Sequence, residues 1–124
     1  MIRYARLVYA GLAWLFVAAI VFQVFLIGLA LFDEPSYRQT HAGVGFLIFF
    51  VVLALLIAAL VARPGRRDVG LVVLLVVLYV VQVSLPGFRT DYPAIAALHP
   101  VNALLMFSVG VYIARSATVL ARSK

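Results

Sequence analysis

Cysteine is absent from this sequence, and charged residues are scarce. The lack of cysteine excludes disulfides, thiol catalysis, iron–sulfur clusters and covalently attached c-type haem. Charged residues make up 11% of the chain and hydrophobic residues 67%, whereas soluble domains average about 25% and about 45–50%. A chain of 124 residues cannot bury so much apolar surface in a soluble core. The composition therefore predicts an integral membrane protein.

Four long stretches contain no Asp, Glu, Lys or Arg: Leu7–Phe32, Gln39–Ala62, Val69–Phe88 and Tyr92–Ala114. Each is long enough to cross a bilayer as a helix, and lipid favours helices even for the Val-rich third stretch. We predict helices over 7–32, 37–62, 69–88 and 92–114. The first has a basic start, but its apolar run is too long for a signal peptide, so we interpret it as a retained helix.

The connections between these stretches are short. They predict an all-α, up-down-up-down four-helix bundle that forms one transmembrane domain over residues 1–124. Ser36 and Gln39 fit a capping box at the start of the second helix. Asp33, Asp68 and Asp91 are expected in loops, so no Ser/His/Asp set can form and no catalytic residue is assigned.

Basic residues divide unequally between the two sides of this bundle. Arg38 and Arg89 lie on one side, and the other side holds the remaining eight of the ten basic residues: Arg3, Arg6, Arg63, Arg66, Arg67, Arg115, Arg122 and Lys124. The positive-inside rule then places both termini in the cytoplasm, in the inner (plasma) membrane. Topogenic arginines and the lipid bilayer account for the net charge of +6, so no nucleic acid is needed as a partner.

Polar residues within the apolar stretches gather toward the outer leaflet. Gln23, His41, Gln82 and His99 fall in the outer halves of the four helices, one on each, and Asn102 lies near the midplane. Polar groups in a membrane are costly and mark functional sites. We expect both glutamines to face the bundle interior, where an amide finds partners.

Small residues follow each histidine. Gly45 lies one turn below His41 in the segment THAGVG, and Ala103 lies one turn below His99 in LHPVNALLMF. A porphyrin needs an axial nitrogen ligand with no bulky side chain against the ring, and neutral imidazole is the commonest metal ligand. Close helix packing and interfacial histidines explain the same pattern, and both interpretations stay open. Met106, further along that face, is expected to serve packing.

The positions of the two histidines resemble those in a known class of membrane proteins. One histidine opening the second helix and another opening the fourth resembles the small membrane b-type cytochromes, namely one half of haem A synthase and the cytochrome b561-like proteins. The phrase LHPVNALLMFSVGVYIAR also resembles a family of uncharacterised four-helix bacterial membrane proteins. The resemblance to the cytochromes implies haem b, with His41 and His99 as axial ligands and Arg38 and Arg89 near the propionates. It implies electron transfer or haem handling, with a redox partner or a larger membrane complex.

Two other functions remain open at this point. The chain fits a small structural or accessory subunit that packs within a larger membrane complex without haem, or a small-molecule or quinone site in the outer leaflet. The first of these assigns the polar residues to interhelical or partner contacts.

The expected heights of the two histidines disfavour their binding to the same iron. Arg63 follows His41 by 22 positions, and Arg115 follows His99 by 16. If both helices end level at these arginines, a rise of 1.5 Å per residue puts His41 about 9 Å nearer the outer surface.

We also expect Pro100 to free the carbonyl of Ala96 as a partner for a histidine ring nitrogen.

The charge distribution makes a testable prediction about topology. A reporter fused after Lys124 should be active in the cytoplasm, because eight of the ten basic residues lie on the side of the termini. Paired alkaline phosphatase and green fluorescent protein fusions measure this. Strong phosphatase activity with a dark fluorescent fusion overturns the orientation.

Overall fold

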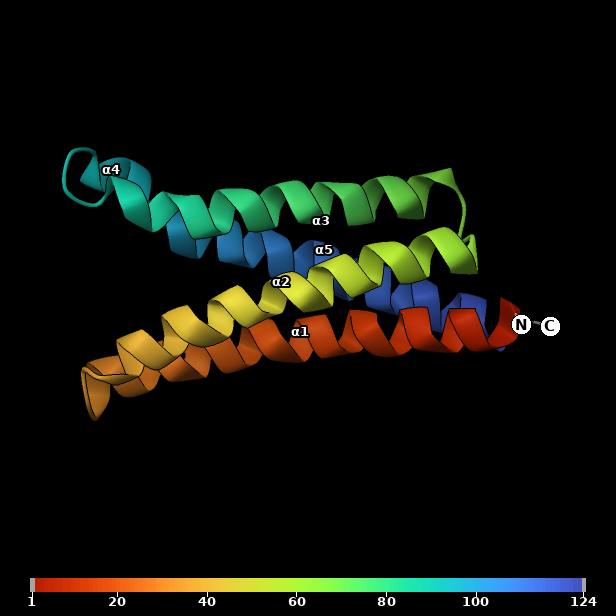
Figure 1. Ribbon diagram of the computed structural model, residues 1–124, viewed down its shortest axis with the longest axis horizontal. Coiled ribbons are helices and arrows are strands. Elements are labelled where there is room, and N and C mark those ends of the chain that lie inside the picture. The colour runs from red at the N-terminus through yellow and green to blue at the C-terminus, as the bar shows by residue number, and fades with distance from the viewer. Residues whose placement is uncertain (1, 124) are drawn as a thin grey trace.

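The computed structural model describes residues 2–123, which are helical apart from short connections (Figure 1). The elements are α1 (Ile2–Phe32), α2 (Tyr37–Ala62), α3 (Arg66–Ser84), the 3-10 turn η1 (Leu85–Phe88), α4 (Pro93–Ala96) and α5 (Leu98–Arg122). Within this range, four helical segments are long and apolar enough to cross a membrane. The all-α four-helix prediction is confirmed. Lys124, counted above among the basic residues, lies outside the described residues.

The helices extend beyond the uncharged stretches. α1 begins at Ile2 rather than Leu7, α3 begins at Arg66 rather than Val69, and α5 runs to Arg122 rather than Ala114. Arginine is a good helix former, and the headgroup regions add to the length that a membrane helix can occupy. The loss of charge therefore marks the apolar part of each helix and not its ends.

Two details of the connections differ from the expectations. Ser36 does not cap α2, because its own backbone is helical (φ −60°, ψ −25°), and its hydroxyl donates to the Glu34 carboxylate at 2.7 Å. Asp68 does not lie in a loop. It belongs to the first turn of α3, is only 9% exposed, and accepts a hydrogen bond of 2.6 Å from Ser116 of α5. This bond joins α3 to α5.

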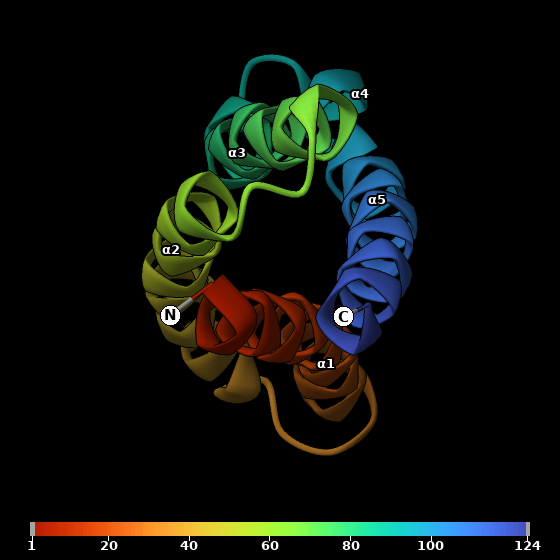
Figure 2. The same cartoon turned by 90° about the vertical axis from the view of Figure 1, so that its right-hand side faces the viewer.

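The helices form a closed ring in which each long helix packs against two neighbours (Figure 2). The order around the ring is α1, α2, α3, α5. Figure 1 shows the termini and the α2–α3 connection at one end, which we call the termini end, and α4 with the α1–α2 connection at the other, which we call the histidine end. The α1–α2 pair and the α3–α5 pair diverge toward the histidine end.

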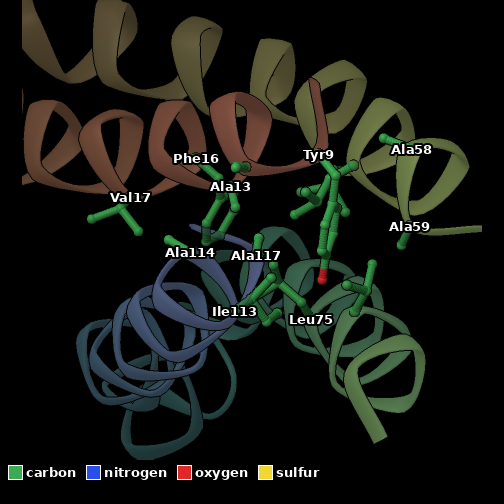
Figure 3. Close-up of a cluster of buried hydrophobic side chains, with 14 of the residues drawn as sticks. Tyr9, Ala13, Phe16, Val17, Ala58, Ala59, Leu75, Ile113, Ala114 and Ala117 are labelled. Atoms are coloured by element: carbon green, nitrogen blue, oxygen red, sulfur yellow. The ribbon is translucent and has the colours of Figure 1, made fainter. Parts of the chain in front are cut away.

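The hydrophobic core occupies the part of the bundle toward the termini end. Figure 3 shows Tyr9 and Phe16 of α1 among small residues of the neighbouring helices. The core includes Ala13, Ala58, Ala59, Ala114 and Ala117, together with Leu55, Leu75 and Ile113. Alanines let membrane helices approach closely, and that close packing drives their association.

Gly110 allows the closest approach of α5 to α1. A Cβ atom at this position would lie 2.9 Å from two ring carbons of Phe16 and 3.4 Å from Val17. The Phe16 ring is fully buried, so it has no free space into which to move. Gly110 therefore serves the packing of α5 against α1.

Gly110→Ala should therefore lower stability by about 1–3 kcal/mol, the usual range for overpacking a core. Gly43→Ala is the matched control, because a Cβ atom at Gly43 would have no neighbour within 4 Å and alanine is the better helix former by about 0.5–1 kcal/mol. Thermal unfolding in detergent, followed by circular dichroism, compares the two. Equal melting temperatures would show that α1 and α5 do not pack as described.

Candidate functional site: paired histidines at one end of the bundle

Five polar side chains from four helices lie together near the histidine end. Gln23 comes from α1, His41 from α2, Gln82 from α3, and His99 and Asn102 from α5. Gln23 is 8% exposed and Asn102 6%, whereas Gln82 and both histidines are half-buried. The expectation that both glutamines face the bundle interior is confirmed.

The two imidazole rings are direct neighbours. Their centroids are 6.1 Å apart and their planes are inclined at 64°. The offset of about 9 Å expected from the helix rise is wrong, because α5 continues to Arg122. Arg115 is therefore not the counterpart of Arg63 at the end of a level helix. An offset of about 9 Å along the bundle is therefore excluded by the ring separation of 6.1 Å.

The centroid separation of the rings, taken alone, is close to the value for two imidazoles on opposite sides of one metal ion. A metal–imidazole bond is about 2.0–2.1 Å long. The ring nitrogen lies about 1.1 Å from the ring centre, so two imidazoles on opposite sides of one ion have centroids about 6.3 Å apart. The observed 6.1 Å differs little from this value.

Each histidine donates to the backbone of the preceding long helix. His41 Nδ1 lies 3.1 Å from the Gln23 carbonyl oxygen, and His99 Nδ1 lies 3.0 Å from that of Gln82. A carbonyl only accepts, so each Nδ1 carries a hydrogen, and in a neutral imidazole the lone pair is then on Nε2. Metal-ligating histidines are oriented in this way. The expected partner, the Ala96 carbonyl, is not used.

Proline leaves the Gln82 carbonyl without a competing N–H from its own helix. In an α-helix this carbonyl would accept from the N–H of the residue four positions on, which here is Pro86, and proline has no N–H. The N–H of Leu85 donates to the Val81 carbonyl, as in a regular helix, and so is not available to the Gln82 carbonyl. The same effect of Pro100 coincides with the interruption at Ala97, between α4 and α5. Pro100 thus helps to set where α5 begins rather than supplying a partner for histidine.

A family model matches residues 23–88, which is more than half of the chain. The chain belongs to DUF6220, a family of unknown function. No curated protein and no solved structure matches this DUF6220 chain. The comparisons give no match to haem A synthase or to cytochrome b561-like proteins, so that likeness stays a resemblance. The matched segment contains Gln23, His41 and Gln82 and ends before His99.

The two glutamine side chains of the DUF6220 chain differ in their contacts. The Gln82 amide nitrogen lies 3.1 Å from His99 Nε2, and its oxygen accepts from the Asn102 amide at 2.7 Å. Asn102 also donates to the Leu78 carbonyl at 2.9 Å. The Gln23 amide nitrogen and oxygen are both buried without a partner. One half of the site is thus satisfied by the protein and the other is not.

The remaining predicted residues surround this group at different depths. Gly45 lies on α2, where a Cβ atom would be 3.6 Å from the Gln23 amide nitrogen, and its carbonyl accepts from the Tyr79 hydroxyl at 3.2 Å. Ala103 is half-buried on α5. Arg38 and Arg89 are exposed, in the first turn of α2 and just after η1.

Met106 and Tyr79 complete the description of the site. Met106 is 1% exposed and belongs to the core, as expected, with its sulfur 3.6 Å from the Asn102 amide. Sequence reasoning did not single out Tyr79, nor the roles of Gln82 and Asn102. The sequence did contain one signal for the pairing of each glutamine with a histidine, because their spacing is nearly the same in both cases. Gln23 precedes His41 by 18 positions, and Gln82 precedes His99 by 17.

Restoring the missing N–H tests the role of Pro86. In Pro86→Ala the new N–H competes for the Gln82 carbonyl, so the hydrogen bond of His99 Nδ1 should weaken. Nitrogen NMR of the imidazoles measures this as a shift of the His99 signals with those of His41 unchanged. Pro93→Ala, at the exposed start of α4, serves as the control. Unchanged His99 signals in Pro86→Ala would contradict the assignment.

Proposed function

We propose that this DUF6220 protein binds haem b between α2 and α5 at the histidine end, with His41 and His99 as axial ligands through Nε2. The observation that carries the proposal is the pair of imidazoles, 6.1 Å apart, each with Nδ1 hydrogen-bonded to a backbone carbonyl. Those bonds fix the tautomer that leaves an Nε2 lone pair for a metal.

The small number of protein ligands favours a porphyrin over a bare metal ion. Among residues 2–123, no group of three or more His, Cys, Asp or Glu side chains is placed to hold a metal. Two imidazoles alone leave most coordination positions of a metal unfilled. A porphyrin fills four of them with its own nitrogens, and paired histidines then complete an axial set.

The surroundings of the histidines fit a flat, largely apolar group. Few large core side chains lie at this level, since the hydrophobic core extends from the termini end only to about Ile20, Ile48 and Tyr79. Gly45 and Ala103 are the small residues on the two histidine helices. The α1–α2 and α3–α5 pairs diverge here (Figure 1).

Polar groups near the histidines also fit this ligand. Arg38 and Arg89 are exposed cations at the same end and suit carboxylates such as the propionates. A groove of about 710 Å³ beside Asp68 and Ser116 lies near the termini end, so it does not serve the histidines.

Haem would supply one-electron redox chemistry within the membrane, which suits electron transfer or haem handling. The chain holds the imidazoles at one height, and the carbonyls of Gln23 and Gln82 raise the basicity of both ligands. With both termini in the cytoplasm, as the basic residues indicate, the site lies in the outer half of the inner membrane. A redox partner then docks on that side.

A second candidate is an accessory subunit of a larger membrane complex. The observation in its favour is the network of Asn102, Gln82 and His99, whose hydrogen bonds are made within the chain and need no ligand. Under this proposal the network joins α3 to α5, and exposed apolar faces contact a partner.

Histidine substitutions test the haem proposal. His41→Ala and His99→Ala should each remove most of the low-spin haem spectrum after haem-replete expression, because each deletes one axial ligand. Gly45→Leu should also reduce haem content, since a large side chain enters the space beside His41. Met106→Leu is the control and should leave the spectrum intact. Visible absorbance and the pyridine haemochrome assay give haem per protein.

Two outcomes would overturn the proposal. One is a colourless wild-type protein after haem-replete expression. The other is a normal haem spectrum in the double variant of His41 and His99. Either result favours the accessory-subunit candidate.

A further inference from the structure

The two histidines are not equivalent, although their rings are direct neighbours. A neutral imidazole with a protonated Nδ1 has one lone pair, on Nε2. In His99 this lone pair already accepts from the Gln82 amide at 3.1 Å. It can accept this hydrogen bond or bind a metal, but it cannot do both. In this structure His99 is therefore blocked as a ligand.

The blocking amide is itself held in one orientation. The Gln82 oxygen accepts from Asn102 at 2.7 Å, and Asn102 donates from the same amide nitrogen to the Leu78 carbonyl at 2.9 Å. Because the Leu78 carbonyl only accepts, it fixes which end of Asn102 faces Gln82. That in turn directs the N–H of Gln82 toward His99. Asn102 is 6% exposed, so its hydrogen bonds to Gln82 and Leu78 are shielded from water.

His41 has no such restraint. Its Nδ1 donates to the Gln23 carbonyl, and residues 2–123 provide no hydrogen bond to its Nε2. The Gln23 amide, which occupies the corresponding place in the first half of the chain, bonds to neither histidine. The lone pair of His41 is available without any rearrangement.

We infer that His41 is the permanent ligand of the haem and that Gln82 with Asn102 forms a latch controlling whether His99 ligates. This inference rests on the proposed function. With the latch closed, the axial position on the His99 side is open to a small neutral ligand such as a diatomic gas. With the latch open, His99 fills that position. Gln82 and Asn102 are thus positioning residues that act through His99.

The experiment compares variants of the full chain, purified in detergent and titrated with haemin. Gln82→Leu and Asn102→Leu remove the latch, and Gln23→Leu is the matched control, because it replaces the same residue type in the other half. A hydrogen bond that competes for Nε2 of His99 lowers the equilibrium constant for binding of His99 to the haem iron by about fivefold. Both latch variants should therefore raise the ratio of six-coordinate low-spin to five-coordinate haem by about fivefold to tenfold. Carbon monoxide should bind to their reduced forms more slowly by a similar factor.

The histidine variants separate the two ligands. His99→Ala should keep haem in five-coordinate, high-spin form that binds carbon monoxide fast. His41→Ala should lose haem, because the remaining histidine is blocked by Gln82. Gln82→Val, which also removes the amide and adds no haem ligand, replaces Gln82→Leu if the latter fails to fold by circular dichroism and gel filtration.

A measurement without haem tests the latch directly. In the apoprotein, nitrogen NMR should show the His99 Nε2 signal shifted by its hydrogen bond, and Gln82→Leu should remove that shift. Gln23→Leu should leave the His41 Nε2 signal unchanged. An unshifted His99 Nε2 in the wild type would overturn the latch.

The outcomes distinguish the inference from the proposed function. If His41→Ala and His99→Ala lose haem equally, and Gln82→Leu behaves as Gln23→Leu does, the latch is wrong and haem binding stands. If the wild type takes up no haem, the proposed function is overturned, and the control of ligation is overturned with it.

Discussion

The hydrogen bond from each histidine Nδ1 to a carbonyl of the preceding long helix determines most of the site. It relates the height of His41 on α2 to Gln23 on α1, and the height of His99 on α5 to Gln82 on α3. It also fixes the tautomer, because a carbonyl accepts only from a protonated nitrogen. Ring separation, lone-pair position and the competition at His99 all follow from these two bonds. Without them His41 would have no hydrogen bond within the described part of the chain to fix its orientation, and His99 would keep only its bond to the Gln82 amide.

The packing at the termini end makes this arrangement possible. There, alanines, Gly110 and the fully buried Phe16 bring α1 against α5, and the hydrogen bond from Ser116 to Asp68 joins α5 to α3. Close packing of small residues stabilises helix pairs in a membrane. The histidine end has fewer large core side chains and more polar ones. The apolar core and the polar cluster thus occupy different ends of the same helices.

Apolar stretches and scarce charge were enough to predict four helices and their antiparallel order, because lipid leaves few alternatives to a helix. The same reasoning correctly placed Gln23 and Gln82 in the interior. It misplaced Asp68 and the end of α5, since arginines extend helices past the apolar core. The height of His99 depends on that extension, so counting residues to Arg115 gave the wrong register. Partners of the ring nitrogens depend on helix rotation, which a hydrophobic pattern this uniform does not specify.

The differences between the two halves of the chain coincide with the parts of the latch. Four positions after Gln82 is Pro86, whereas four positions after Gln23 is Ile27, whose N–H can bond the Gln23 carbonyl within α1. Three positions after His99 is Asn102, whereas three positions after His41 is Val44. The shared elements, a glutamine carbonyl and a histidine, would by themselves make two equal ligands. Pro86 leaves the Gln82 carbonyl without an N–H four residues on that would compete for it, and Asn102 orients the Gln82 amide toward Nε2 of His99. Both differences occur in the second half and act on the same imidazole: within residues 2–123, Nε2 of His99 has a hydrogen-bond partner and Nε2 of His41 has none.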